Sequence, residues 1–373
     1  MIERAFWLAW SQIPGVGATL LRRLEKHFGN LATAWGATGS ELVEVEGFGP
    51  QTAELIVVER QKLNPDRLLQ DHEQQNPQFW TPADPEYPRL LLEIPDPPPL
   101  LYYQGRVDLA ENQGLTPLVA IVGTRDPSDY GKRWTRRIAS TLAQNGFTIV
   151  SGLADGIDTE AHRSCLEAGG RTLAVMGTGV DMVYPWSNRF LYQQVIEHGL
   201  VLSEYPAGTQ PDRGHFPRRN RIIAGFSRAT LVMEAPKKSG ALITARLAND
   251  YGRDIYALPG SLDNPKAIGC LRLLNQGAHV ILSEAELLEM LGALPQLYLV
   301  PPPQQTSLPL NLEPTLEKVL LTLADLSQDE NAIQFDRIVQ HSELPASAVS
   351  SALLQLELLG LVAQLPGMRY RKQ

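Results

Sequence analysis

The sequence predicts an α/β protein whose largest domain, residues 81–292, is a doubly wound parallel sheet. Within that domain, short runs that are apolar on both faces alternate with helical patterns. Such strands are typical of a parallel sheet covered by helices on both sides, and right-handed crossovers then make the sheet doubly wound. Hydrophobic residues are 43% of the 373 positions and charged residues 20%, so sizeable cores in two or three domains are expected.

The strands and helices of this domain follow from the same alternation. The predicted strands are 118–122, 147–150, 172–176, 200–203, 229–235, 254–260 and 278–282. The predicted helices are 130–146, 158–170, 188–199 and 241–252. Before them, the proline-rich segment 76–105 is predicted to be an extended linker and lead-in, because its prolines disfavour helix.

Residues 1–70 are predicted to form a small helical domain built on an internal repeat. An apolar-x-Gly-apolar-Gly motif followed by an amphipathic helix occurs twice, with glycines Gly15 and Gly17 in the first copy and Gly47 and Gly49 in the second. Two such copies are typical of the helix-hairpin-helix pattern, whose backbone amides meet a DNA phosphate. These four glycines are therefore candidate DNA contacts, and a helical protein-interaction domain is the alternative.

The C-terminal region is predicted to be a Pro/Gln-rich linker, 293–314, followed by a winged-helix domain, 315–373. That domain is expected to contain three helices and a terminal hairpin: helices 315–326, 335–342 and 345–360, with the hairpin turning at Pro366 and Gly367. The third helix would enter the major groove in a winged-helix DNA reader. It has no lysine or arginine, which favours a protein-contact or auxiliary role.

An arginine cluster between residues 213 and 228 predicts a phosphate-binding site. The whole chain is acidic, with a formal net charge of -8 and a pI of about 5.5, yet no carboxylate occurs inside this stretch. The guanidinium fork fits phosphate oxygens, and the stretch is predicted to be a loop between two strands. Its five arginines are Arg213, Arg218, Arg219, Arg221 and Arg228.

Three glycine-containing loops are expected beside that cluster, at the carboxyl ends of the parallel strands. They are 123–125, 151–156 and 177–179, and their amides can approach a phosphate closely. None of them carries the G-x-G-x-x-G or Walker A pattern, so no nucleotide cofactor is predicted. No spacing typical of a metal site occurs either.

The acidic and histidine residues of the domain give no nucleophile–base pair. Asp158 is expected to cap the helix that begins near it, and His162 to pack locally. Glu204 and Glu234 each end a strand and either act in a site or bind loop arginines. The chain has two distant cysteines, no apolar run long enough to span a membrane and no signal-peptide pattern, which predicts a cytoplasmic protein.

The central domain resembles the DprA/Smf family, DNA processing protein A, over nearly all of 82–292. The motifs that carry the resemblance are AIVGTR, SGLADGIDTEAH, AVMGTGVDMVYPWSN, FPRRNRIIAG and SGALITARLANDYGRDIYALPG. The flanking domains are similar to family accessories, a SAM-like helix-hairpin-helix domain and a winged helix. The resemblance implies an extended Rossmann-like fold that forms a homodimer.

The resemblance also implies a non-enzymatic function. Such proteins bind incoming single-stranded DNA during natural transformation, protect it, help displace single-strand binding protein and load the RecA recombinase. A single-strand binder needs cations for phosphates and a surface for bases, with no nucleophile. The predicted contacts are Arg125, Arg218, Arg219 and Arg221 with Asn220 for phosphates, backbone groups at Gly123, Thr124, Gly152, Ser239 and Gly240, and Phe216 for base stacking.

Alternatives remain open for several of these residues and for the function. Arg218 either joins the site or points away, Phe216 either stacks on a base or packs in the core, and some arginines bind carboxylates instead. The competing enzyme is a nucleoside-monophosphate phosphoribohydrolase of the lysine-decarboxylase-like group. Its PGGxGTxxE signature would fall on PKKSGALITARLA, which lacks the catalytic glutamate. The third hypothesis is a scaffold that binds recombination proteins without contacting DNA.

Overall fold

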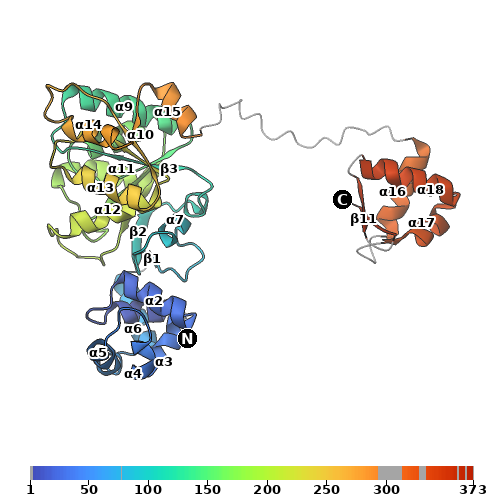
Figure 1. The fold of residues 1–373 in the computed structure, drawn as a ribbon, viewed down its shortest axis with the longest axis horizontal. Coiled ribbons are helices and arrows are strands. Elements are labelled where there is room, and N and C mark those ends of the chain that lie inside the picture. Colours follow the sequence, from blue (N-terminus) through green and yellow to red (C-terminus); the bar gives the residue numbers. More distant parts are fainter. Residues whose placement is uncertain are drawn as a thin grey trace. The chain divides into compact units, whose positions relative to one another are not determined.

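The structure is a computed structural model of the chain. It describes residues 3–76, 78–292, 313–326, 333–358, 361–365 and 368–372. The described residues up to Gly292 belong to one compact unit, and those from Glu313 onward belong to a second (Figure 1). The predicted linker 293–314 and the predicted turn at Pro366 and Gly367 lie outside the described residues, apart from the linker's last two positions.

The described part of the first unit contains a nine-stranded sheet in the order β1-β2-β6-β5-β4-β3-β7-β8-β9. The strands are β1 Phe79–Trp80, β2 Leu101–Gly105, β3 Leu118–Val122, β4 Thr148–Ser151, β5 Thr172–Met176, β6 Leu200–Ser203, β7 Ala229–Val232, β8 Asp254–Ala257 and β9 His279–Val280. Every pairing from β6 to β9 is parallel, whereas β2 pairs antiparallel with both β1 and β6. The predicted doubly wound parallel sheet is therefore confirmed.

Helices cover both faces of this sheet, as its apolar strands require. Alternate residues of β3 point to opposite cores: Leu118, Ala120 and Val122 to one, Val119 and Ile121 to the other. The helices are α7 Arg89–Leu92, α8 Leu109–Asn112, α9 Asp129–Gln144, α10 Ile157–Glu167, the 3-10 helix η1 Trp186–Asn188, α11 Arg189–His198, α12 His215–Phe226, α13 Gly240–Asp250, α14 Ile268–Asn275 and α15 Glu284–Met290. Helices α12, α13 and α14 pack on the first face, and α9, α10 and α15 on the second (Figure 1).

The proline-rich segment 76–105 differs from the predicted linker because it joins the sheet. Strands β1 and β2 form one edge, and the short helix α7 lies between them. Proline is tolerated at a helix start, which is where Pro88 lies before α7. The extended conformation was predicted, but its pairing with the distant β6 depends on tertiary contacts.

The N-terminal helices repeat one turn geometry, as the glycine motif predicts. The helices are α1 Glu3–Ser11, α2 Ala18–Phe28, α3 Leu31–Gly36, α4 Gly39–Val43, α5 Pro50–Arg60 and α6 Pro65–Gln75. Gly15 and Gly47 have φ angles of 83° and 94°, a left-handed conformation that glycine adopts without strain. The turns before α2 and α5 close with equivalent backbone hydrogen bonds, Val16 N to Ile13 O and Phe48 N to Val45 O, both 3.1 Å.

The second unit contains the three helices that the sequence predicts there. They are α16 Pro314–Leu326, α17 Phe335–Ser342 and α18 Ala346–Leu358. A three-stranded antiparallel sheet accompanies them, with β10 Ile333–Gln334, β11 Val362–Leu365 and β12 Arg369–Lys372 in the order β10-β12-β11. The strand β10 was not predicted. The winged-helix architecture is confirmed.

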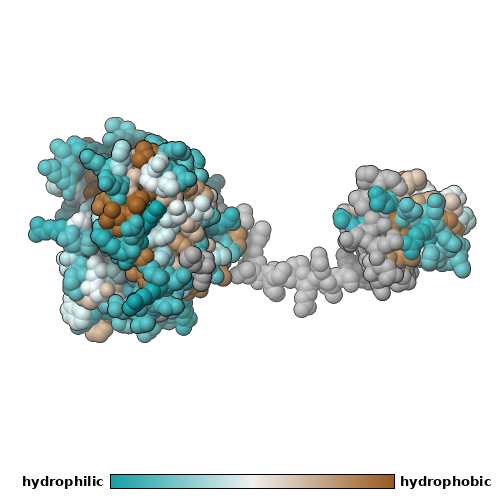
Figure 2. All heavy atoms as spheres, turned by 90° about the horizontal axis from the view of Figure 1, so that it is seen from below, coloured by the Kyte–Doolittle hydropathy of each residue, from teal (hydrophilic) through white to brown (hydrophobic). Residues whose placement is uncertain are grey.

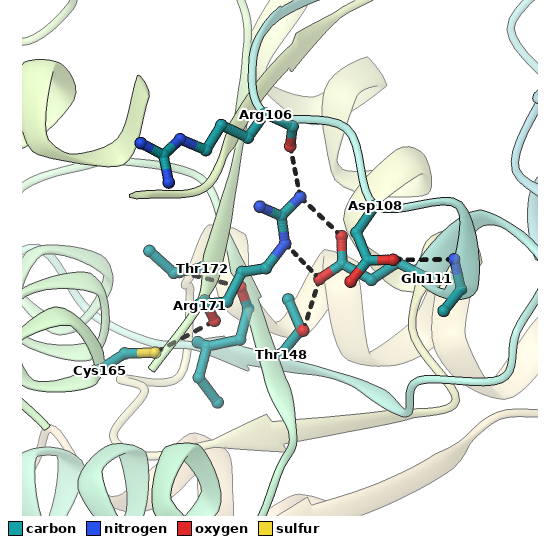
Figure 3. A network of polar contacts seen from close by, with 9 residues as sticks. Arg106, Asp108, Glu111, Thr148, Cys165, Arg171 and Thr172 are labelled. Atoms are coloured by element: carbon teal, nitrogen blue, oxygen red, sulfur yellow. Dashed lines mark hydrogen bonds and ion pairs between the residues drawn. The ribbon is translucent and has the colours of Figure 1, made fainter. Parts of the chain in front are cut away.

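A buried ion pair ties the amino ends of β4 and β5 together, at the end of the sheet opposite the glycine loops. The Glu111 carboxylate accepts hydrogen bonds from Arg171 at 2.7 and 2.9 Å and from the Thr148 hydroxyl at 2.6 Å (Figure 3). Arg171 also donates to the Arg106 carbonyl. Because both charges are partnered, burial of Glu111 is tolerated and the network fixes this end of the sheet.

Figure 2 shows a mostly hydrophilic face of the first unit, on which hydrophobic side chains gather only in small groups. Among the described helices, none is both long and apolar enough to cross a bilayer.

Candidate nucleic-acid interface

A groove of about 660 Å³ lies at the carboxyl ends of the parallel strands, where the sheet changes direction. The chain proceeds from β3 outward through β4, β5 and β6, then returns to place β7 on the other side of β3. Such a switch point opens a crevice between the loops that follow the two strands, and ligands of doubly wound sheets bind there. We call this the central groove, and its lining includes Gly123, Thr124, Arg125, Tyr184, Arg213, Phe216, Arg219, Asn220, Lys238, Ser239 and Gly240.

Most of the arginine cluster is helical, so its prediction as a loop was wrong for Arg218, Arg219 and Arg221. Helix α12 covers His215–Phe226. Pro217 lies in its first turn, where proline is tolerated, and Ile222, Ile223 and Phe226 are buried against the sheet. Burial of this apolar face stabilises the helix, although the glycine and proline at its start are typical of a turn.

Three of the five arginines lie on α12, which distributes them around its axis, and Arg213 and Arg228 lie outside the helix. Arg213 is exposed and lines the central groove, while Arg219 and Arg221 are buried. Arg218 lines a different groove, described below, and so points away from the central one. Arg228 lies at the amino end of the sheet, where its amide donates to the Leu118 carbonyl. The five arginines do not form one surface.

Arg219 forms part of the floor of the groove, although its side chain is almost completely buried. Its Nη1 donates to the Val175 carbonyl at 2.5 Å. Burial lowers the pKa of Arg219 to about 10, while the nearby Asp158 favours its charged form. Arg219 is therefore cationic at neutral pH and adds positive potential beneath the groove without an exposed contact.

Arg221 forms ion pairs with two carboxylates. Its Nη2 lies 2.6 Å from Glu204 Oε2, and its Nε lies 3.3 Å from Asp96 Oδ2. The pairing with Glu204 was one of the alternatives that the sequence left open. This guanidinium is committed to holding α12 against its neighbours, which corrects its assignment as a phosphate contact.

Three exposed cations line the central groove: Arg125, Arg213 and Lys238. In the described part of the chain, none of them forms an ion pair. Only Arg125 was assigned to the site from the sequence. Arg213 belonged to the recognised cluster, and Lys238 lies in the loop after β7, one residue before the N-cap of α13, a position that the sequence analysis did not assign.

Two aromatic rings close one side of this groove. The Phe216 and Tyr184 rings have centroids 5.4 Å apart, and the Arg125 guanidinium lies 5.8 Å from the Phe216 centroid. Phe216 is only half-buried and faces the groove rather than the core. Tyr184 was not predicted as a site residue, although it belongs to a motif quoted for the family resemblance.

The predicted cradle of free amides is partly occupied by the protein itself. The Thr124 amide donates to the Glu234 carbonyl at 2.7 Å, and the Gly152 amide donates to Asp158 at 3.1 Å. Neither amide is free for phosphate, which corrects that part of the prediction. Ser239 caps α13 through the Ala241 amide, and the Gly240 carbonyl accepts from the Asn220 side chain at 3.4 Å.

Three glycines are required for close approach rather than for phosphate binding. A Cβ on Gly152 would lie 1.8 Å from Arg219 Nη1. A Cβ on Gly156, whose φ is 83°, would lie 2.5 Å from the Thr124 carbonyl oxygen. Gly123 is similarly confined, since its Cβ would meet the Ile157 side chain at 2.4 Å. These glycines bring the loops after β3 and β4 together at the groove.

The buried Glu234 carboxylate organises the loop after β3. It accepts from the Ser128 amide and hydroxyl, both at 2.7 Å, and from the Asn264 side chain at 2.9 Å. Both oxygens are therefore engaged, and the carboxylate holds the start of α9 in place. Its role is to position the groove, one of the two outcomes left open for it.

Asp158 and His162 have local structural partners. The cap of α10 is Gly156, not Asp158 as predicted; Asp158 instead accepts from the Gly152 and Ala154 amides, and burial raises its pKa. Burial also lowers the pKa of His162 to about 3, so the imidazole is neutral and lies 2.6 Å from the Thr172 hydroxyl, matching its predicted local packing. Among the described residues, no cluster able to hold a metal ion is found.

The first helix-hairpin-helix turn borders a second groove, also about 660 Å³, which we call the hairpin groove. Its lining includes Gly15, Gly17, Arg218, Arg221 and Arg246, and it shares Pro217 and Ile243 with the central groove. No side chain caps the start of α2 at Gly17, so the first amides of α2 have no partner from a cap.

The second hairpin has a different environment. A Cβ on Gly47 would lie 2.6 Å from Arg23 Nη1, and Arg23 pairs with Glu46 at 3.4 Å. Neither Gly47 nor Gly49 lines the hairpin groove. The two copies of the repeat therefore share a backbone conformation, but only the first lines the hairpin groove, and the arginine beside the second is paired with Glu46.

Two family models and two curated relatives indicate one family. The family described as DNA recombination-mediator protein A matches residues 78–292, and the DprA winged helix domain matches residues 301–368. Protein Smf of Synechocystis sp. is 53% identical over 399 aligned residues, covering 100% of this chain and 99% of that protein. DNA processing protein DprA of Streptococcus pneumoniae is 46% identical over 202 residues, covering 54% of this chain and 70% of that protein.

Two solved structures are similar over much of the chain. DNA processing protein A from S. pneumoniae aligns with a TM-score of 0.66 at 34% identity, covering 78% of this chain and 98% of that one. DNA processing protein A from Helicobacter pylori aligns with a TM-score of 0.51 at 33% identity, covering 57% of this chain and 95% of that one. The H. pylori structure is described for that protein's single-stranded DNA binding mode.

Proposed function

This chain belongs to the DNA recombination-mediator protein A (DprA/Smf) family, and on that basis we propose that it binds single-stranded DNA along the central groove. One observation carries the proposal. Three cations with no ion pair in the described part of the chain, Arg125, Arg213 and Lys238, surround an aromatic pair at the switch point of the sheet. The cations can bind the phosphates of a nucleic acid, and the rings can stack with its unpaired bases.

The groove favours a flexible strand over a duplex. Phe216 and Tyr184 present ring faces or edges beside the cations, and only bases that are not stacked inside a helix reach such rings. The buried Arg219 adds charge from below. No nucleophile is needed for this role, and the engaged oxygens of Glu234 leave it poorly placed to act as a base.

Titration of the full chain with labelled oligonucleotides tests the function. Single-stranded DNA should bind more tightly than a duplex of the same length, and the logarithm of the affinity should fall linearly with the logarithm of salt concentration. Equal affinity for both forms would contradict the proposal. Release of free base from nucleoside monophosphates, measured in parallel, would favour the phosphoribohydrolase instead.

The finer roles expected of the family are part of the same proposal. We infer that the protein protects incoming DNA during natural transformation, helps displace single-strand binding protein, loads the RecA recombinase and forms a homodimer through the central domain. RecA filament formation on DNA coated with single-strand binding protein should accelerate when this protein is added. Sedimentation should give the mass of two chains. If RecA filaments formed no faster in the presence of this protein, RecA loading would be contradicted. If sedimentation gave the mass of one chain, the homodimer would be contradicted.

We also propose that the strand continues from the central groove into the hairpin groove. The two grooves share Pro217 and Ile243, and Arg218 and Arg246 supply cations where the first hairpin presents uncapped amides. Among the four predicted glycines, this assigns contact to Gly15 and Gly17 and leaves Gly47 and Gly49 structural.

An Arg218→Ala plus Arg246→Ala variant should lose affinity only for strands long enough to reach the hairpin groove. Because two phosphate contacts are removed, the loss at low salt should be about 100-fold for long oligonucleotides and absent for the shortest that bind. Arg163→Ala is the matched control, since α10 covers the other face of the sheet. A loss independent of length would place both arginines in the central site or in the fold.

A further inference from the structure

An exposed aromatic surface adjoins the central groove, and neither the family match nor the proposed phosphate site explains it. Trp186 is 69% exposed and Phe190 is 70% exposed. They border a hollow of about 480 Å³ whose lining also includes Arg189 and Gln193. Large aromatic rings are normally more buried than this, so two exposed side by side indicate a surface that is covered by a ligand.

Arg189 links the two rings. Its guanidinium lies 5.6 Å from the Trp186 centroid and 4.3 Å from the Phe190 centroid. In the described part of the chain it forms no ion pair. The surface therefore offers two ring faces with a cation between them, which we call the aromatic platform.

The platform is fixed firmly to the rim of the central groove. Asn188 lies between Trp186 and Phe190 in the sequence. Its buried side chain donates to the Leu153 carbonyl and the Thr159 hydroxyl, both at 2.9 Å. The Ser187 hydroxyl donates to Asp155 at 2.9 Å. Asp155 belongs to the loop after β4, so η1 and the start of α11 are held against the loop that borders the DNA groove.

Tyr184 connects the two surfaces. It lines the central groove, and with Asp155, Arg125 and Phe216 it also lines a small cleft beneath the rim. Trp186 follows it by two residues in the chain. A strand that leaves Phe216 and Tyr184 therefore meets the aromatic platform next. Two carboxylates lie along this path: Asp155, which accepts from the Ser187 hydroxyl, and Asp181, which lines the platform hollow and accepts from the Gly208 amide at 2.9 and 3.0 Å.

We propose that the aromatic platform stacks unpaired bases of the same single strand whose phosphates occupy the central groove. Every base has a π face, so alternating rings and a guanidinium bind a strand whatever its sequence. The proposal rests on the proposed function, because it extends that site from phosphate contact to base contact. It assigns Trp186 and Phe190 as stacking residues and Arg189 as the cation between them.

Binding measured with the full chain tests this assignment. A Trp186→Ala plus Phe190→Ala variant should bind a single-stranded oligonucleotide about 30-fold more weakly, because each base–aromatic stack contributes about fivefold or more. It should bind an abasic deoxyribose-phosphate strand of equal length and charge as the parent does. The dependence of affinity on salt should not change, since no phosphate contact is removed.

Two further variants serve as matched controls. Trp186→Phe should keep affinity within about twofold, because phenylalanine still stacks. It should lose most of the quenching of tryptophan fluorescence expected for the parent with DNA, since Trp186 is the most exposed indole among the described residues, whereas Trp7, Trp10 and Trp80 are buried and Trp35 and Trp134 are half-buried. Leu262→Ala removes an apolar side chain that is 81% exposed and should leave affinity unchanged.

Several outcomes would overturn the proposal. Unchanged affinity of the double variant, while an Arg125→Ala plus Arg213→Ala variant loses binding, would mean that the strand does not cross the platform. An equal loss on the abasic strand would assign the effect to phosphate binding or folding. A change in sedimentation of the DNA-free double variant would assign the surface to a second copy of the chain. Failure of the parent protein to bind single-stranded DNA would refute the proposed function itself.

Discussion

An Arg125→Ala plus Arg213→Ala variant should lose about 100-fold in affinity for single-stranded DNA at low salt. Both side chains are exposed, line the central groove and have no ion pair in the described part of the chain. A hydrogen bond to a charged group contributes about 1.5 kcal/mol or more, so two lost contacts give about 3 kcal/mol. The slope of the logarithm of affinity against the logarithm of salt concentration (the salt slope) should flatten by about 1.4, since each neutralised phosphate of a single strand contributes about 0.7.

Arg228→Ala is the control that distinguishes a site defined by the groove from one defined by the arginine cluster in the sequence. Arg228 belongs to the same sequence cluster, but it lies at the amino end of the sheet, away from the groove. Its removal should leave both affinity and salt slope unchanged. If Arg228→Ala weakened binding as much as the double variant, the site would follow the sequence cluster and the groove assignment would be lost. Circular dichroism establishes that each variant is folded before it is titrated.

Gly152→Ala should destabilise the protein by about 3 kcal/mol. The new Cβ would lie 1.8 Å from Arg219 Nη1 and 2.4 Å from its Cζ, so the guanidinium would have to leave its buried position. Displacing it breaks the bond to the Val175 carbonyl and leaves Asp158 without its cation. Breaking buried charged and hydrogen-bonded partners costs about this much. Denaturant unfolding measures the change.

A double-mutant cycle tests the cause of that loss. Arg219→Ala alone should also cost about 3 kcal/mol, but Gly152→Ala added to it should cost little more, because the clashing atoms are gone. Additive losses would contradict the close approach of these two residues. Gly240→Ala is the matched control: nothing lies within 4 Å of its added Cβ, so stability should not fall.

Local sequence patterns were sufficient to predict much of the fold. The strand predicted at 118–122 and the one at 172–176 have the observed bounds, because an unbroken apolar run is buried wherever the sheet forms. The helix predicted at 335–342 also has its observed bounds. The repeated glycine motif predicted two equivalent turns, since a positive φ at Gly15 and Gly47 is a property of the local backbone.

The candidate site was only partly predictable. Arg125 and Phe216 were identified from their motifs and do line the groove. Arg221 was misassigned because its partners, Asp96 and Glu204, lie far from it in sequence. The amides of Thr124 and Gly152 looked free because the groups that accept from them come from other elements of the fold.

The sequence by itself determined the doubly wound sheet, the helical and winged-helix flanks, and the loops at which a polyanion would bind. These depend on periodicity, glycine and turn chemistry, which act over a few residues. Only the tertiary structure decided which cations are free. The direction in which α12 presents each arginine, and the carboxylate or carbonyl that lies opposite, are set by packing between distant segments. Free charge in the groove is therefore a property of the folded chain rather than of the arginine cluster in its sequence.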